Sequence, residues 1–185
     1  MTAPLQLAYY KGMKGTNGAL QFNLQRPHYY CTEPGCREKV YDSMFPPEKC
    51  PREGCPGGKM KSREGALFLE ITSTKGPNIY DWDNKIIFAL SAEDMSKFLL
   101  VLEGSTDEVK LLHDPGAKSA SQGKVIKTLQ LSSPQGIKTG VICRVSQKNA
   151  GEEKTITHQV PLDASETKRL AVCLRAAIPI AYSWC

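Results

Sequence analysis

The sequence predicts an α+β protein in which four antiparallel strands and a helix occur twice in succession (ββββα–ββββα), with a small zinc-ribbon insert. Apolar segments with alternating or β-branched character fall into two groups of four. Each group is followed by a segment with helical periodicity. A stretch rich in Cys, Pro and Gly separates the second strand from the third. We therefore expect one domain at 1–27 and 62–185, and a zinc-ribbon insert at 28–61.

The first group of strands is expected at 5–10, 18–24, 66–72 and 85–90. Lys75-Gly76-Pro77-Asn78 predicts a turn before the fourth strand, because Gly and Asn tolerate positive φ and Pro presets a turn. Ser91, with Asp94 three residues later, resembles a capping box and predicts the start of a helix. Its apolar residues recur at helical spacing, and these are Met95, Phe98, Leu99 and Leu102.

The second group of strands is expected at 107–115, 124–131, 139–147 and 155–162. A C-terminal helix follows over 165–184, and either Ser165 or Asp163 begins it. Pro179 is expected to bend this helix, because the proline ring clashes with the backbone one turn earlier. The apolar face includes Leu170, Cys173, Leu174, Ala177, Ile178, Ala181 and Tyr182. A face of this width predicts burial in the monomer core, in a shared oligomer core, or in both.

The composition excludes several classes of protein. With 41% hydrophobic and 23% charged residues, the 185-residue chain can bury a core and is not wholly disordered. A net charge of +5 favours polyanionic partners without establishing nucleic-acid binding. Membrane association is not expected, because no apolar run approaches the roughly 18 residues of a membrane span. The first residues resemble neither a signal nor a transit peptide, so we expect an intracellular protein or a processed form. Nucleus, organelle and cytoplasm are not distinguished.

Four of the seven cysteines fall close together, and these are Cys31, Cys36, Cys50 and Cys55. Two Cys-x4-Cys pairs separated by thirteen residues are typical of a zinc ribbon, in which each knuckle supplies two thiolates to one tetrahedral Zn²⁺. Gly35 and Gly54 precede the second cysteine of each pair, where a knuckle needs a permissive backbone. A redox or fortuitous cluster is the alternative, and His28 is a substitute ligand or a packing residue. In so short a segment, metal binding would supply the folding free energy.

Aromatic residues and lysines are combined at the turn before the fourth strand. Tyr80 and Trp82 offer faces on which bases stack, with Tyr10, Phe22 and Phe68 as weaker candidates. Core packing is the alternative for Trp82. Because Asp81 and Asp83 would repel phosphate, fixing the turn is the alternative for Tyr80-Asp81-Trp82 as a whole. The lysines expected to neutralise phosphates are Lys11, Lys14, Lys75, Lys85, Lys118, Lys124 and Lys127. For Lys11 and Lys14, solubilising a hairpin edge is an equally good explanation.

Several strings follow one another in the order of a known pattern. They are Tyr10-Lys11-Gly12 with Gly18-Ala19-Leu20, Tyr80-Asp81-Trp82-x-x-Lys85 with Phe88-x-Leu90-Ser91, His113-Asp114-Pro115 with Gly123-Lys124-Val125, and Ile178-Pro179 to Trp184. Together they resemble the Whirly family of single-stranded DNA-binding proteins and the related kinetoplastid guide-RNA-binding proteins. The resemblance implies two four-stranded antiparallel sheets packed across one another, a homotetramer mediated by the helices, and nucleic acid running over sheet edges. It implies no catalysis. The zinc ribbon and the longer first hairpin depart from typical plant members.

Two functional hypotheses follow from these features. The first is a non-enzymatic binder of single-stranded nucleic acid that acts in DNA maintenance, transcription or RNA processing. DNA and RNA are not distinguished, because both offer bases and phosphates. The alternative is a zinc-ribbon adaptor that oligomerises and docks a polymerase or RNA-processing protein. An enzyme is third, because no paired carboxylates or nucleophile–histidine pair is evident and a four-thiolate site leaves no open position.

Overall fold

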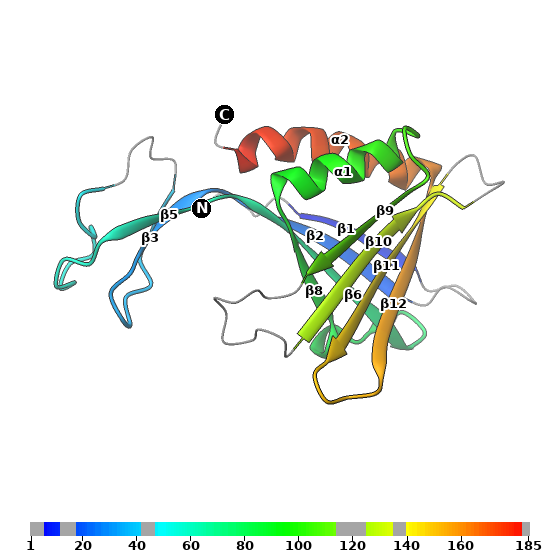
Figure 1. Cartoon of the computed structure of the whole chain (residues 1–185), viewed down its shortest axis with the longest axis horizontal. Coiled ribbons are helices and arrows are strands. Elements are labelled where there is room, and N and C mark those ends of the chain that lie inside the picture. The colour runs from blue at the N-terminus through cyan, green and yellow to red at the C-terminus, as the bar shows by residue number, and fades with distance from the viewer. Residues whose placement is uncertain (1–5, 12–17, 42–46, 114–124, 135–139, 183–185) are drawn as a thin grey trace.

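A computed structural model describes residues 6–11, 18–41, 47–113, 125–134 and 140–182. Two antiparallel sheets pack on each other, two helices lie side by side along one end of them, and a small lobe projects away (Figure 1). Among the described residues, no helix is long and apolar enough to cross a bilayer.

The first sheet has five strands rather than the four expected. They are β1 (Gln6–Lys11), β2 (Gly18–Gln25), β6 (Ala66–Gly76), β7 (Ile79–Tyr80) and β8 (Ile86–Leu90). β2 lies between β1 and β6, and both β7 and β8 pair with β6. The extra strand arises because β6 continues to Gly76, past the end expected at 72, before the chain turns back at Pro77-Asn78. Asn78 has a φ of 57°, the left-handed conformation that such a turn needs.

The second sheet has the four strands expected, in the order β12-β11-β10-β9 with antiparallel neighbours. They are β9 (Glu108–His113), β10 (Val125–Ser132), β11 (Gly140–Asn149) and β12 (Thr155–Asp163). The inner faces of both sheets and one side of each helix form a single core. Its largest fully buried side chains are Phe88, Phe98, Leu20, Leu69, Ile71, Leu90, Met95, Leu129, Leu131, Leu170, Leu174 and Val145. Most of them follow the strand and helix periodicities in the sequence.

The helices α1 (Ala92–Leu102) and α2 (Ala164–Ala181) begin with capping boxes. Ser91 caps α1 with Asp94, as predicted. Asp163 rather than Ser165 caps α2, because its carboxylate accepts from the Glu166 N–H while the Glu166 side chain accepts from the Asp163 N–H. Pro179 lies inside α2, which continues to Ala181. Cys173 and Tyr182, expected on the apolar face, are exposed, because the buried stripe passes through Leu170, Ala171, Leu174, Ala177 and Ala181.

The projecting lobe contains a third sheet, where the sequence predicted no strands of useful length. It consists of β3 (His28–Cys31), β4 (Lys39–Tyr41) and β5 (Met60–Arg63), with β3 in the centre. These strands are too short for alternation to reveal them. The Gln25↔Ala66 pair of β2 and β6 is followed by the His28↔Arg63 pair of β3 and β5, so the register does not change. The lobe therefore extends the central hairpin of the first sheet; its treatment as a separate insert at 28–61 stays a prediction.

Replacing the cap of α2 tests the assignment of the helix start. Asp163→Ala is expected to lower the free energy of unfolding by about 1 kcal/mol, because the Glu166 N–H loses its acceptor. Ser165→Ala, at the other candidate position, is the matched control and should leave stability nearly unchanged. Urea denaturation measures both. Equal losses from the two substitutions would contradict the assignment.

Candidate nucleic-acid interface and metal centre

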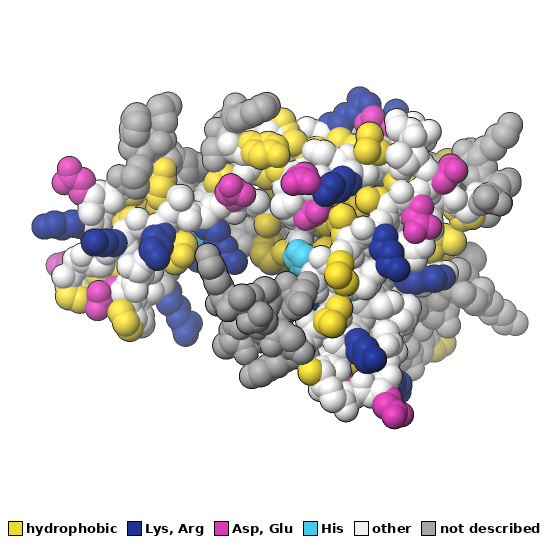
Figure 2. Space-filling model, viewed as in Figure 1, with side chains coloured by type: hydrophobic (Ala, Val, Ile, Leu, Met, Phe, Trp, Pro, Cys, Tyr) yellow, Lys and Arg dark blue, Asp and Glu magenta, His cyan; other side chains and the backbone are white. Residues whose placement is uncertain are grey.

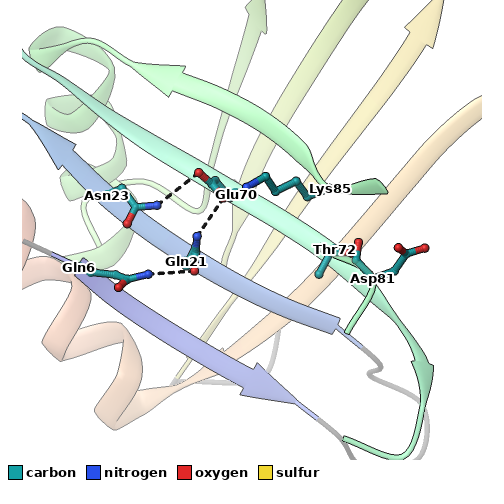
Figure 3. Close-up of polar contacts among 7 residues, drawn as sticks. All are labelled: Gln6, Gln21, Asn23, Glu70, Thr72, Asp81 and Lys85. Atoms are coloured by element: carbon teal, nitrogen blue, oxygen red, sulfur yellow. Dashed lines mark hydrogen bonds and ion pairs between the residues drawn. The ribbon is translucent and has the colours of Figure 1, made fainter. Parts of the chain in front are cut away.

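A ladder of polar side chains crosses the outer face of the first sheet (Figure 3). The Gln6 side-chain amide donates to Gln21 at 3.0 Å, and Gln21 donates to a Glu70 carboxylate oxygen at 2.9 Å. Asn23 donates to the other Glu70 oxygen at 3.4 Å. Sequence reasoning did not identify these residues as part of a site, although the period-2 alternation of 18–24 placed Gln21 and Asn23 on one face. The face is thus polar and organised around one carboxylate.

Lys85, the residue just before β8, joins this ladder from the other side of β6. Its Nζ lies 2.6 Å from the same Glu70 carboxylate that Gln21 contacts (Figure 3). The Lys85 side chain is 32% exposed and the Glu70 side chain 13%. Lys85 therefore lies on this polar face, but its charge is balanced by a neighbour that the sequence did not indicate, and its contact with phosphate stays a prediction.

Three aromatic rings form a cluster at one end of this face. The Tyr10 ring centroid lies 5.2 Å from that of Tyr80 and 6.5 Å from that of Trp82. Tyr10, at the end of β1, is 54% exposed, and Trp82, in the 3₁₀ turn η1 (Trp82–Asn84), is half-buried. Trp82 is not among the buried core residues. We call Tyr10, Tyr80 and Trp82 the aromatic cluster. Because Tyr10 is 70 residues before Tyr80 in the sequence, only the folded sheet brings the rings together.

Asp81 fixes the turn that presents the aromatic cluster. Its backbone N–H donates to the Ser73 carbonyl at 2.9 Å, and its own carbonyl accepts from the Thr72 hydroxyl, so the turn is held against β6 (Figure 3). Lys75 lies 2.8 Å from the Asp81 carboxylate. The hydrogen bond from Lys75 lowers the pKa of Asp81, and the same bond raises the pKa of Lys75. The Lys75 charge is thus shared with the turn and is only partly available to a phosphate.

Of the remaining predicted lysines, only Lys127 has a side chain that the structure describes. Lys127 donates from Nζ to the Ile87 carbonyl at 2.8 Å, which links β10 to β8, and burial lowers its pKa. Of Lys11 only the backbone, at the end of β1, is described. Three lysines lie outside the described residues: Lys14, Lys118 and Lys124. Among the weaker stacking candidates, Phe68 is half-buried. The prediction that Phe22 offers a stacking surface is wrong, because Phe22 is a core residue with 2% exposure.

The four clustered cysteines meet at the far end of the lobe, all within 4.8 Å of one another. The Cys31 and Cys55 sulfurs are 3.8 Å apart, and the Cys36 and Cys50 sulfurs are 3.7 Å apart. A disulfide would need about 2.05 Å. Four thiolates about 2.3 Å from a central zinc ion, at the corners of a tetrahedron, would lie about 3.8 Å apart. The thiol spacing is therefore compatible with Zn²⁺.

Both cysteine knuckles have the same backbone turn. The Cys36 N–H donates to the Glu33 carbonyl at 3.0 Å, and the Cys55 N–H donates to the Arg52 carbonyl at 3.1 Å. Gly35 and Gly54, each one residue before a cysteine, have φ values of 79° and 78°. This left-handed conformation is the one that glycine adopts without strain. The sequence repeat thus produces two equivalent turns, each of which directs a second thiol toward the centre.

The backbone around the thiols leaves little room for change. A Cβ atom on Gly58 would lie 2.5 Å from the Cys31 sulfur, so only glycine fits there. Backbone N–H groups of Gly58 and Gly57 lower the pKa of Cys55 to about 7, whereas burial raises the pKa of Cys50, so these shifts favour the thiolate at Cys55 and not at every member of the group. His28 is not part of the thiol group. The donor set, its spacing and this glycine all fit a metal ion held by four thiolates.

The order of the elements, with two antiparallel sheets each followed by a helix, defines the class of fold. The family model of the Whirly transcription factor matches residues 50–172, and the chain belongs to the Whirly family. The chain is 29% identical over 122 residues to the mitochondrial single-stranded DNA-binding protein WHY2 of Arabidopsis thaliana. That match covers 66% of this chain and 50% of the relative, so the chain spans about half the length of this curated relative.

Solved structures share the fold. The crystal structure of WHY1 from Arabidopsis thaliana superposes with a TM-score of 0.72 at 20% identity, covering 100% of this chain and 88% of that chain. The structure of a guide-RNA-binding protein complex bound to guide RNA superposes with a TM-score of 0.51 at 11% identity. The match covers 96% of this chain and 90% of that chain. The resemblance to both groups inferred from the sequence is therefore confirmed at the level of the fold.

Removing one thiol tests the metal centre. Elemental analysis of the purified protein is expected to find one zinc ion per chain, and Cys31→Ser is expected to abolish it, because a three-thiolate site loses much of its affinity. The matched control is Cys173→Ser, which alters an exposed cysteine outside the group and should keep all the zinc. A metal-free native protein, or full zinc in Cys31→Ser, would contradict the assignment.

Proposed function

We propose that this protein binds single-stranded DNA over the outer face of its first sheet and does not act as an enzyme. The observation that carries the proposal is the partly exposed aromatic cluster at the end of a polar sheet face. Aromatic rings offer stacking surfaces to bases of any sequence, and only unpaired bases expose their faces. The side-chain amides of Gln6, Gln21 and Asn23 add hydrogen-bonding groups on the same face. Family membership and the relative's name support DNA as the ligand.

The lysines proposed to bind phosphate differ in how far their charge is already engaged by other groups of the protein. Lys75 and Lys85 are each paired with a carboxylate, and such pairing weakens the attraction of a cation for phosphate. Lys127 is engaged with a backbone carbonyl. The predicted contacts of Lys11, Lys14, Lys118 and Lys124 therefore supply most of the phosphate binding in this proposal.

Roles in DNA maintenance, transcription or RNA processing are part of the proposal. RNA is the second ligand to test, since a guide-RNA-binding complex shares the fold.

We further propose that Zn²⁺ is held by Cys31, Cys36, Cys50 and Cys55 and has a structural role. A site with four thiolate ligands leaves no position open for a substrate, so the ion would hold the two knuckles together. The zinc-ribbon adaptor that docks a protein is the alternative function of this lobe.

The intracellular location expected from the sequence agrees with the mitochondrial location in the relative's name.

A homotetramer built on the helices is also part of the proposal. An apolar recess lies beside β1 and α2, lined by side chains that include Leu7, Leu24, Ala177 and Ile180. The outward side of α2 also exposes Val172, by 56%. Recesses and exposed apolar side chains of this kind are typical of surfaces that pack against another subunit. Light scattering at micromolar concentration distinguishes a tetramer from a monomer.

Comparing the affinity for single-stranded DNA with the affinity for duplex DNA tests the proposed function. Fluorescence anisotropy with labelled oligothymidylate is expected to give tight binding that weakens with salt, with a log–log slope of about −0.7 for each phosphate neutralised. Duplex of the same length should bind much more weakly, because its bases cannot stack on Tyr80 or Trp82. Equal affinity for the two forms, or no dependence on salt, would favour the adaptor alternative.

Neutralising Glu70 tests whether the ladder lies on the binding face. Glu70→Gln removes a negative charge and frees Lys85, while the amide oxygen still accepts from Gln21. Affinity for oligothymidylate is expected to rise by about 2- to 5-fold, the scale of one partly exposed ion pair. Glu93→Gln, which makes the same charge change beside Lys97 on α1, is the matched control and should have no such effect. Unchanged affinity in Glu70→Gln would place the DNA elsewhere.

A further inference from the structure

The small sheet of the lobe carries an aromatic and basic face of its own. In one cross-strand row, Tyr30 of β3 is opposite Lys39 of β4 and Lys61 of β5. In the next row, His28 is opposite Tyr41 and Arg63. Residues directly opposite each other in antiparallel strands share a face, and residues two apart in a strand do too. We call these six residues the ribbon face.

The aromatic rings of the ribbon face lie side by side. The His28 ring centroid lies 5.1 Å from that of Tyr41 and 6.4 Å from that of Tyr30. His28 is buried, whereas Tyr41 is 44% exposed and Tyr30 is half-buried. The buried imidazole thus supports two tyrosines whose rings remain accessible. Tyr30 of β3 and Tyr41 of β4 lie in successive cross-strand rows, and rings in successive rows suit successive bases of an unpaired strand.

The cations of the ribbon face are available. Lys39, Lys61 and Arg63 are exposed, and none forms a salt bridge with a carboxylate among the described residues. Neither row contains an acidic residue. Glu38, whose carbonyl accepts from the Cys31 N–H, directly precedes Lys39, so its side chain is expected on the opposite face. Lys and Arg side chains are spread over this lobe in Figure 2. The ribbon face therefore offers unpaired cations, unlike Lys75 and Lys85 on the first sheet.

We propose that the ribbon face is a second contact surface for single-stranded nucleic acid, with bases on Tyr41 and Tyr30 and phosphates on Lys39, Lys61 and Arg63. The inference rests on the proposed function, because it extends the same ligand onto the lobe. Charge complementarity selects a polyanion, and the alternation of rings with cations selects one whose bases are unpaired. An acidic protein segment would satisfy the cations but leave the rings without a matching partner.

The test uses the full chain loaded with zinc and a fluorescent oligothymidylate long enough to span the first sheet and the lobe. Lys39→Ala with Lys61→Ala is expected to reduce the magnitude of the salt slope by about 1.4, for two lost phosphate contacts. Tyr41→Ala is expected to weaken binding roughly 5- to 150-fold, and Tyr41→Phe should restore most of it. Lys49→Ala with Arg52→Ala removes the same charge from the lobe outside the ribbon face and is the matched control. Zinc content verifies that each variant retains the folded lobe.

The outcomes separate this inference from the proposed function. If the native protein does not bind oligothymidylate, the proposed function fails. If the native protein binds but the slope and affinity of the ribbon-face variants equal those of the control variant, the ribbon face does not bind nucleic acid, and the proposed function stands. If polyglutamate competes with the oligothymidylate while Tyr41→Ala binds normally, the face recognises acidic protein and the inference is overturned. A reduced slope together with rescue by Tyr41→Phe supports it.

Discussion

The antiparallel pairing of β2 with β6 is the interaction on which the rest of the structure depends. It forms the centre of the first sheet and continues in the same register into β3 and β5, so that one hairpin carries both the sheet and the lobe (Figure 1). Gly65 lies where the two parts join. Its N–H donates to the Ala181 carbonyl at 3.2 Å, and a Cβ there would lie 2.7 Å from the Ala181 Cα. Only glycine allows this approach, which seats the base of the lobe against the end of α2.

The same strand, β6, organises the proposed binding face. The Glu70 carboxylate accepts hydrogen bonds from the β2 amides of Gln21 and Asn23 on one side and pairs with Lys85 on the other. Thr72 and Ser73 of the same strand hydrogen-bond to the Asp81 backbone and hold the turn. The aromatic cluster is therefore positioned by backbone and hydroxyl contacts that do not involve the rings. A site built in this way leaves its rings partly exposed, and its polar contacts are made before any ligand arrives.

Features encoded by local patterns could be predicted from the sequence, and features encoded by register could not. The Ser91 cap, most strands and the cysteine pairs rest on residues close together in the chain. Asp163 and Ser165 are both good N-caps, so sequence left the start of α2 open. The Glu70–Lys85 pair depends on the register of β6 with β8, which no local pattern specifies. Strands as short as β7 and those of the lobe have too few residues for alternation to reveal them.

The most direct measurement of the central claim is the fluorescence of Trp82 during titration with oligothymidylate. The chain has two tryptophans, so Trp184→Phe leaves Trp82 as the sole emitter. Stacking of a base on the indole is expected to quench the emission saturably, at the concentrations at which anisotropy reports binding, and duplex should quench little. Binding by anisotropy with unchanged Trp82 emission would show that the DNA does not reach the aromatic cluster, and would contradict the account.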